Sequence, residues 1–197
     1  MRMPADQRRQ QLFDVARERF SRQGFHATSM DEIAEAAGVT KPVLYQHFPS
    51  KRALYVELLD DTGRSLLARL ADATGRAATG RERVERGFRA YFDFVVNNRA
   101  AFRLLLGTSM RSDAEFAGIV EEIIQSVSET ISTLIEIPGS SAQKRVLANA
   151  LVGMAEAVGR HALQDPETEP DAEQLAGWIC ELAWFGLRGV RADGTPD

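Results

Sequence analysis

The sequence has few of the residues on which enzyme and metal sites depend. A single cysteine, Cys180, excludes an intramolecular disulfide and fits a reducing compartment, so we expect a cytoplasmic protein. The 3 histidines, His26, His47 and His161, lie far apart in the chain and show no metal-ligand spacing. We therefore expect no catalytic residues, no metal and no cofactor.

Long apolar stretches and strand-like alternation are absent as well. No run reaches the roughly 18 apolar residues of a membrane span, and the N-terminus lacks the apolar core of a signal peptide. No glycine-rich phosphate loop follows a strand, and no segment alternates convincingly between apolar and polar residues. The sequence thus predicts an all-α protein that is neither a membrane protein nor an enzyme.

The charges of the two ends of the chain differ in sign. The whole chain carries a net charge of −4, but residues 1–56 contain 9 Lys/Arg against 6 Asp/Glu, while residues 57–197 contain 15 against 22. A basic end on an acidic body favours an approach to nucleic acid with the N-terminal part first. Arg2, Arg8 and Arg9 form a basic lead-in, which either reaches the DNA backbone or minor groove or is a solvated arm.

Helical spacing of apolar residues predicts about nine helices. They are expected near residues 5–23, 30–37, 41–48, 51–73, 81–97, 100–108, 113–136, 141–164 and 171–190. Turn-forming residues such as the Pro138-Gly139 step separate them, and residues 191–197 are expected to be a frayed tail.

Residues 28–52 contain the most specific local pattern. Ser29 and Glu32 form a capping box at the start of one short helix, and Gly38 supplies the left-handed conformation that ends it. Pro42 suits the first turn of a second short helix, and Ser50 can cap the long helix that follows. Two short helices joined by a tight turn are the plan of a helix-turn-helix, which places its second helix in the DNA major groove.

The second short helix has an inner and an outer face. Leu44 and Phe48, four residues apart, are expected to point inward. Of the outward trio Pro42, Val43 and Gln46, the glutamine can pair with adenine and the valine can touch a thymine methyl. We expect phosphate contacts from side chains of Lys41, Tyr45, His47 and Lys51, and from the helix N-termini at Thr28, Ser29 and Thr40. A unit that serves only packing, with Tyr45 and His47 as ordinary surface residues and Lys51-Arg52 as a solvated helix start, is the alternative. For His47 alone, a structural hydrogen bond is a further alternative.

Residues 8–58 resemble the DNA-binding domain of the tetracycline-repressor (TetR) family of bacterial transcription regulators. The matching pieces are Phe20, Gly24-Phe25, residues 28–34, 37–39 and 44–48, and Lys51-Arg52-Ala53-Leu54, about a quarter of the chain. The resemblance implies a three-helix DNA-binding domain at 1–56 and a helical ligand-binding and dimerisation domain at 57–197. It also implies a homodimer on double-stranded operator DNA.

The last two predicted helices carry features of a partner surface. In 141–164 the polar residues Asn149, Glu156 and Arg160 share one narrow stripe, and a helix that is apolar nearly all round must be covered on two sides. Trp184 falls in a polar row and is expected to be exposed in a monomer. The resemblance implies dimerisation through these helices, at Leu151, Ala155, Val158, Gly159, Trp178, Leu182, Trp184 and Phe185. For Trp178 and Phe185, a place in the core of the single chain is the alternative.

Apolar and aromatic residues between 81 and 135 suggest a sensor region for a hydrophobic small-molecule effector. The candidates are Phe88, Tyr91, Phe92, Val95, Phe102, Met110, Phe116, Val120 and Ile123. Tyr91 has the better claim because a buried hydroxyl needs a partner, whereas ordinary core is the alternative for every one of them.

Together these features predict a homodimeric repressor that a small hydrophobic ligand releases from a pseudo-palindromic operator. A helical ligand-binding or scaffolding dimer without regulatory DNA binding is the alternative. An activator is equally compatible, because the sign of regulation depends on where the operator lies.

Overall fold

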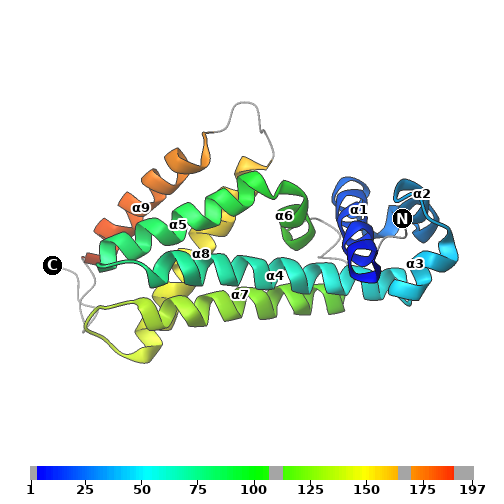
Figure 1. Ribbon diagram of the computed structural model, residues 1–197. Coiled ribbons are helices and arrows are strands. Elements are labelled where there is room, and N and C mark those ends of the chain that lie inside the picture. The colour runs from blue at the N-terminus through cyan, green and yellow to red at the C-terminus, as the bar shows by residue number, and fades with distance from the viewer. Residues whose placement is uncertain (1–3, 107–112, 164–169, 189–197) are drawn as a thin grey trace. The chain divides into compact units, whose positions relative to one another are not determined.

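The computed structural model describes residues 4–106, 113–163 and 170–188. Within these ranges the chain forms nine helices and no strand (Figure 1). The helices are α1 (Ala5–Ala27), α2 (Met30–Ala36), α3 (Lys41–His47), α4 (Lys51–Gly75), α5 (Gly80–Asn97), α6 (Arg99–Leu106), α7 (Ala114–Leu134), α8 (Ser141–Ala162) and α9 (Ala172–Arg188). The all-α prediction is confirmed, and the ends differ from those expected by a few residues. The predicted tail at 191–197 lies outside the described ranges.

The described residues belong to two compact units. Unit 1 comprises Met1–Arg64 and Ala100–Val120, and unit 2 comprises Ser65–Arg99 and Glu121–Asp197. We expected a boundary after residue 56, but α6 and the first turns of α7 group with the N-terminal helices. The physical reason is an aromatic cluster that α7 completes.

This cluster lies in the core of unit 1. Phe116 of α7 is fully buried, and its ring centroid lies 4.8 Å from that of Phe25 and 4.7 Å from that of Tyr55. Phe20 packs edge-on against Tyr55 at 5.0 Å. Gly24, with φ 78°, interrupts the helical backbone of α1 where the sequence predicted its end, just before Phe25. We expected Phe116 to line a ligand pocket, with ordinary core as the alternative, and its enclosure by aromatic rings supports the alternative.

Unit 2 is built on α5, along which α9 lies (Figure 1). Its core combines large rings on one helix with small side chains on the others. Phe88 and Phe92 of α5 share one buried cluster with Ala148 and Ala155 of α8. Cys180 of α9 belongs to the same cluster and is buried.

The described helices contain neither a membrane-spanning segment nor a cluster of metal-binding side chains. None of these helices has the length and hydropathy needed to cross a membrane. Among the same residues, no three His, Cys, Asp or Glu side chains gather in a way that could hold a metal ion.

Candidate DNA-binding site

The start of α2 and the turn between α2 and α3 have the features that the sequence predicted. The Ser29 hydroxyl accepts a hydrogen bond from the Glu32 amide at 3.2 Å, and the Glu32 carboxylate accepts one from the Ser29 amide at 2.7 Å. Gly38 adopts φ 65°, which favours glycine, and Pro42 lies in the first turn of α3. These features fix the path of the chain between the two helices.

The two faces of α3 are separated as expected. Leu44 and, directly after the helix, Phe48 are fully buried in unit 1. Tyr45 leaves 42% of its surface exposed, and Pro42 and Gln46 are exposed as well. Val43 and His47 are half-buried at the edges of this outer face. The exposed side chains are therefore carried by a helix whose position is fixed from the opposite side.

The start of α2 differs from our expectation that it receives phosphates. Thr28 is only 1% exposed, and its hydroxyl donates to the Gly24 carbonyl at 2.8 Å. The Ser29 hydroxyl also contacts the Glu32 carboxylate, at 2.9 Å, and the hydrogen bond from the Ser29 amide lowers the pKa of Glu32. The Thr28 side chain is therefore enclosed, and the Ser29 amide, one of the backbone groups expected to receive a phosphate, is bonded to Glu32. The N-terminus of α2 already holds a carboxylate of the chain itself.

Thr40 occupies the N-cap position of α3 without making a side-chain cap. Its carbonyl accepts hydrogen bonds from the amides of Val43 and Leu44, but its hydroxyl makes no hydrogen bond to the helix. Thr40 is exposed. Unlike the start of α2, the start of α3 therefore has a hydroxyl that is not committed to the helix.

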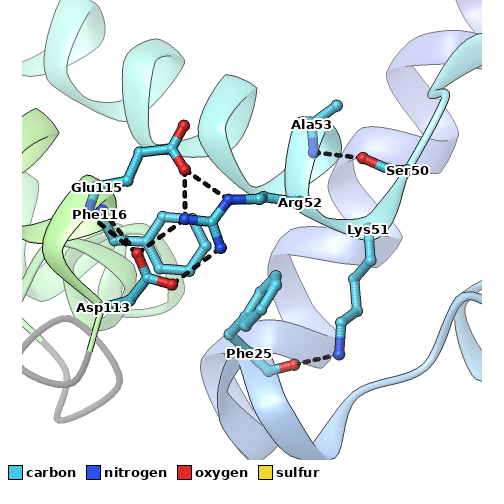
Figure 2. Close-up of polar contacts among 8 residues, drawn as sticks. All are labelled: Phe25, Ser50, Lys51, Arg52, Ala53, Asp113, Glu115 and Phe116. Carbon is cyan, nitrogen blue, oxygen red and sulfur yellow. Dashed lines mark hydrogen bonds and ion pairs between the residues drawn. The ribbon is translucent and has the colours of Figure 1, made fainter.

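Lys51 has a structural role where we expected a phosphate contact. Its ammonium donates to the Phe25 carbonyl oxygen at 2.8 Å (Figure 2). It also donates to the Thr28 carbonyl oxygen at 2.8 Å and lies 4.4 Å from the centre of the Phe25 ring. A cation beside carbonyls at the end of a helix is favourable, because these groups lack partners within the helix. Lys51 thus ties the start of α4 to the end of α1.

Arg52, the next residue, makes a set of contacts that the sequence did not predict. Its two terminal nitrogens each lie 2.9 Å from an oxygen of Asp113, and it also pairs with Glu115 (Figure 2). Its guanidinium lies 4.6 Å from the centre of the Phe116 ring. The hydrogen bond from Arg52 lowers the pKa of Asp113, whose carboxylate also accepts from the Glu115 and Phe116 amides.

A second pair missed by the sequence analysis joins α2 to α3. The Lys41 ammonium lies 2.8 Å and 2.9 Å from the two carboxylate oxygens of Asp31. The hydrogen bond to Asp31 raises the pKa of Lys41. Acidic residues are common in the first turn of a helix because they interact favourably with the helix dipole. Nothing in the sequence therefore linked Asp31 to a lysine ten residues later.

The predicted basic lead-in is partly bound to the fold. Arg9 pairs with Glu57 of α4, and its guanidinium lies 4.6 Å from the centre of the Phe48 ring. Arg8 donates to Gln11 within α1 at 2.7 Å. Arg2 lies outside the described residues. Arg8 and Arg9 therefore lie on the surface of α1 rather than in a solvated arm.

The outer face of α9 also differs from the prediction. Trp178, Leu182 and Phe185 are 61%, 62% and 61% exposed, so the alternative that Trp178 and Phe185 form monomer core is wrong. Trp184 is half-buried, and its ring fills the space beside Gly80, where an added Cβ would lie 3.6 Å from it. The correction follows from this glycine, whose missing side chain leaves room for the indole.

The residues predicted on α8 face inward. Leu151 and Ala155 belong to the core of unit 2, Gly159 is buried and Val158 is half-buried. Buried side chains leave little surface for a second copy of the chain. Glu156 and Arg160, from the polar stripe of this helix, form an ion pair.

The predicted effector residues do not form one group. Phe102, Phe116 and Val120 belong to unit 1, whereas Phe88, Tyr91, Phe92, Val95 and Ile123 belong to unit 2, and Met110 lies outside the described residues. Phe88 and Phe92 are core residues of unit 2. Burial raises the pKa of Tyr91, the candidate with a polar group, and Glu156 and Arg160 are the charged residues that act on it.

Comparisons with known proteins agree with this architecture. Residues 12–58 match the family model of the bacterial regulatory proteins of the tetR family, and residues 81–186 match that of the tetracyclin repressor-like C-terminal domain. The chain is 32% identical over 191 residues to the HTH-type transcriptional activator FasR of Mycolicibacterium smegmatis, covering 96% of this chain and 87% of that protein.

Solved structures show the same likeness. A TetR-like transcriptional regulator from Rhodococcus sp. RHA1 is similar with a TM-score of 0.80 and 32% identity, over 96% of this chain and 100% of that one. FadR from Bacillus subtilis, solved in complex with stearoyl-CoA, shares the fold with a TM-score of 0.75 at 17% identity, over 92% and 99% of the two chains. The helix-turn-helix of α2 and α3 and these matches to both parts of the chain show that it belongs to the TetR family and is a DNA-binding transcription regulator.

Proposed function

We propose that α3 reads operator DNA through its outer face, with Gln46 and Val43 at base edges and Lys41, Tyr45 and His47 at phosphates. The observation that carries this proposal is the division of α3 into a buried side at Leu44 and an exposed side at Tyr45 and Gln46. Exposed side chains on a fixed helix can be placed in a major groove without disturbing the core. The protein would act in the cytoplasm, where bacterial DNA lies.

The outer ridge of α9, defined as Trp178, Leu182 and Phe185, supports a homodimer. Three large apolar side chains on one helix face are costly to leave in water, and full burial of each contributes about 1.5–3 kcal/mol. Val146 of α8 is 67% exposed and adds a further apolar residue to the surface of unit 2. A two-fold dimer would present two copies of α3 to the half-sites of a pseudo-palindromic operator.

We further propose that a hydrophobic small molecule changes the affinity for the operator through unit 2. The core of this unit is dominated by apolar side chains of α5, α8 and α9. The complex of FadR with stearoyl-CoA makes a fatty acyl thioester the first class of effector to test. An effector with different affinities for two states of the dimer shifts DNA binding by linkage. The operator position then decides between repression and activation.

Fluorescence anisotropy tests the DNA-binding part of this proposal. DNA from upstream of the protein's own gene is titrated at two salt concentrations with the wild type, Gln46→Ala and the double variant Lys41→Ala/Tyr45→Ala. Wild-type binding should weaken steeply with salt, because phosphate contacts release counterions. The double variant should lose affinity for all sequences, whereas Gln46→Ala should relax discrimination at one base position by about 1–3 kcal/mol.

Arg76→Ala is the matched control, because Arg76 is a well-exposed cation outside the helix-turn-helix. It should bind like the wild type. If the wild type binds neither this DNA nor any duplex selected from a random pool, a ligand-binding or scaffolding dimer without regulatory DNA binding is the better account.

A further inference from the structure

The pair between Asp31 and Lys41 lies at the surface beside the outer face of α3. The two side chains are 66% and 52% exposed, and both carboxylate oxygens of Asp31 lie within 2.9 Å of the Lys41 ammonium. Lys41 is the first residue of α3, and Asp31 lies in the first turn of α2. The Asp31 carboxylate thus pairs with the Lys41 ammonium, the group that the proposed function assigns to a DNA phosphate.

The two acidic residues at the start of α2 have different tasks. Glu32 completes the capping box with Ser29, so its carboxylate serves the helix itself. Asp31 instead extends to Lys41 on the next helix, and the hydrogen bond between them raises the pKa of Lys41. Asp31 can leave Lys41 without breaking the cap of α2.

We propose that Asp31 limits the affinity of this protein for DNA by neutralising Lys41 in the free state. This inference rests on the proposed binding of DNA by α3. On binding, the ammonium exchanges the carboxylate for a phosphate, which is feasible because exposed ion pairs in water are weak. Asp31 then remains as a negative charge close to the DNA backbone, where it opposes binding.

This exchange has a thermodynamic signature. A free lysine that binds a phosphate releases condensed counterions from DNA, which contributes about 0.9 to the slope of log affinity against log salt. The released carboxylate of Asp31 must recruit counterions of its own, which reduces this gain. Asp31→Asn should therefore bind DNA more tightly at low salt, by up to about fivefold given the strength of exposed pairs. Its salt dependence should be steeper, by up to about one unit of slope.

The test is a double-mutant cycle measured by anisotropy on one non-specific duplex and one upstream duplex over a range of salt concentrations. The variants are Asp31→Asn, Lys41→Gln and the combination of both. Glu35→Gln is the matched control, because Glu35 is also an exposed acidic residue of α2. The gain from Asp31→Asn should disappear in the Lys41→Gln background and exceed any gain from Glu35→Gln. Asp31→Ser is a second variant with a side chain that suits a helix start.

Three results would overturn the inference. Weaker binding by both Asp31 variants would mean that the carboxylate holds Lys41 in a productive position. A gain that persists with Gln at position 41, or that Glu35→Gln reproduces, would reflect general charge rather than this pair. A wild type that binds no DNA is a separate result, because it removes the proposed function as well.

Discussion

Arg52 binds Asp113 with both terminal nitrogens of its guanidinium, at 2.9 Å each, although 61 residues separate the two in the sequence. The same carboxylate accepts hydrogen bonds from the amides of Glu115 and Phe116 at the start of α7. Lys51, the residue before Arg52, binds the carbonyl oxygens at the end of α1. The first turn of α4 therefore connects two other helices of unit 1 through adjacent cations.

Removal of the guanidinium should destabilise unit 1. We expect Arg52→Gln to lower the midpoint of thermal unfolding, because the bidentate contact with Asp113 and the contact with the Phe116 ring are both lost. The losses of unfolding free energy caused by Arg52→Gln and Asp113→Asn should be less than additive in the double variant, since both substitutions remove the same interaction. Arg103→Gln, at an exposed cation of α6, is the control. Fully additive effects would show that the pair contributes nothing to stability.

The same pair predicts a dependence on acid pH. The pKa of Asp113 is lowered in the folded protein by the hydrogen bond from Arg52, so the contribution to stability is present above the ordinary carboxyl pKa. It is lost as pH falls through the lowered pKa of the folded state. The difference in unfolding free energy between the wild type and Asp113→Asn should therefore shrink on acidification, measured by urea unfolding from neutral pH to below about pH 4.

Truncation of Phe116 should cost about 3–5 kcal/mol of unfolding free energy, in the range for a large aromatic removed from a core. Phe116 is fully buried against Phe25 and Tyr55, and its loss leaves a cavity that this rigid cluster cannot fill. Urea unfolding of Phe116→Ala measures the effect, with the exposed Tyr45→Ala as control. A small loss of stability would return Phe116 to the class of pocket residues.

Tyr55 predicts a loss of stability at alkaline pH. Burial raises the pKa of Tyr55 to about 12, so the native state favours the neutral phenol. Its contribution is complete below the unfolded pKa of about 10 and is lost as pH rises from there through 12. The unfolding free energy of Tyr55→Phe should therefore decline less steeply over this interval than that of the wild type. The unfolding free energy of Tyr45→Phe, a substitution at an exposed tyrosine, should decline as steeply as that of the wild type.

A carboxylate on the outer ridge of α9 should prevent dimerisation. Leu182 is 62% exposed between Trp178 and Phe185, so Leu182→Glu should fold normally but sediment as a monomer. Ala142→Glu adds the same charge at an exposed position of α8 and should remain a dimer. Trp184→Phe should also remain a dimer, because the Trp184 ring packs beside Gly80. A Leu182→Glu protein that stays dimeric by analytical ultracentrifugation would place the interface elsewhere.

The local features were predictable because each depends on a few neighbouring residues. The capping box of Ser29 and Glu32, the turn at Gly38 and the inward side of Leu44 follow from short-range hydrogen bonding and helical spacing. The contacts of Lys51 and Arg52 were not predictable. A basic pair at a helix start looks the same in the sequence whether it faces solvent, a helix end or a distant carboxylate.

The two tryptophans of α9 show the same limit. Spacing along the helix puts Trp178 and Trp184 on different faces, but it does not say which face another helix covers. The polar row around Trp184 suggested solvent, whereas Gly80 of α5 provides a space that the indole fills. The covered face depends on a contact across about a hundred residues, which no local pattern records.

The outer face of α3 has a consequence for how such a regulator can change over time. Pro42, Tyr45 and Gln46 are exposed, while Leu44 and, directly after the helix, Phe48 are buried in the core. Substitutions on the exposed face cost little stability, so the preferred operator can drift without a compensating change elsewhere. A duplicated copy of the gene could therefore acquire new target promoters through one or two substitutions.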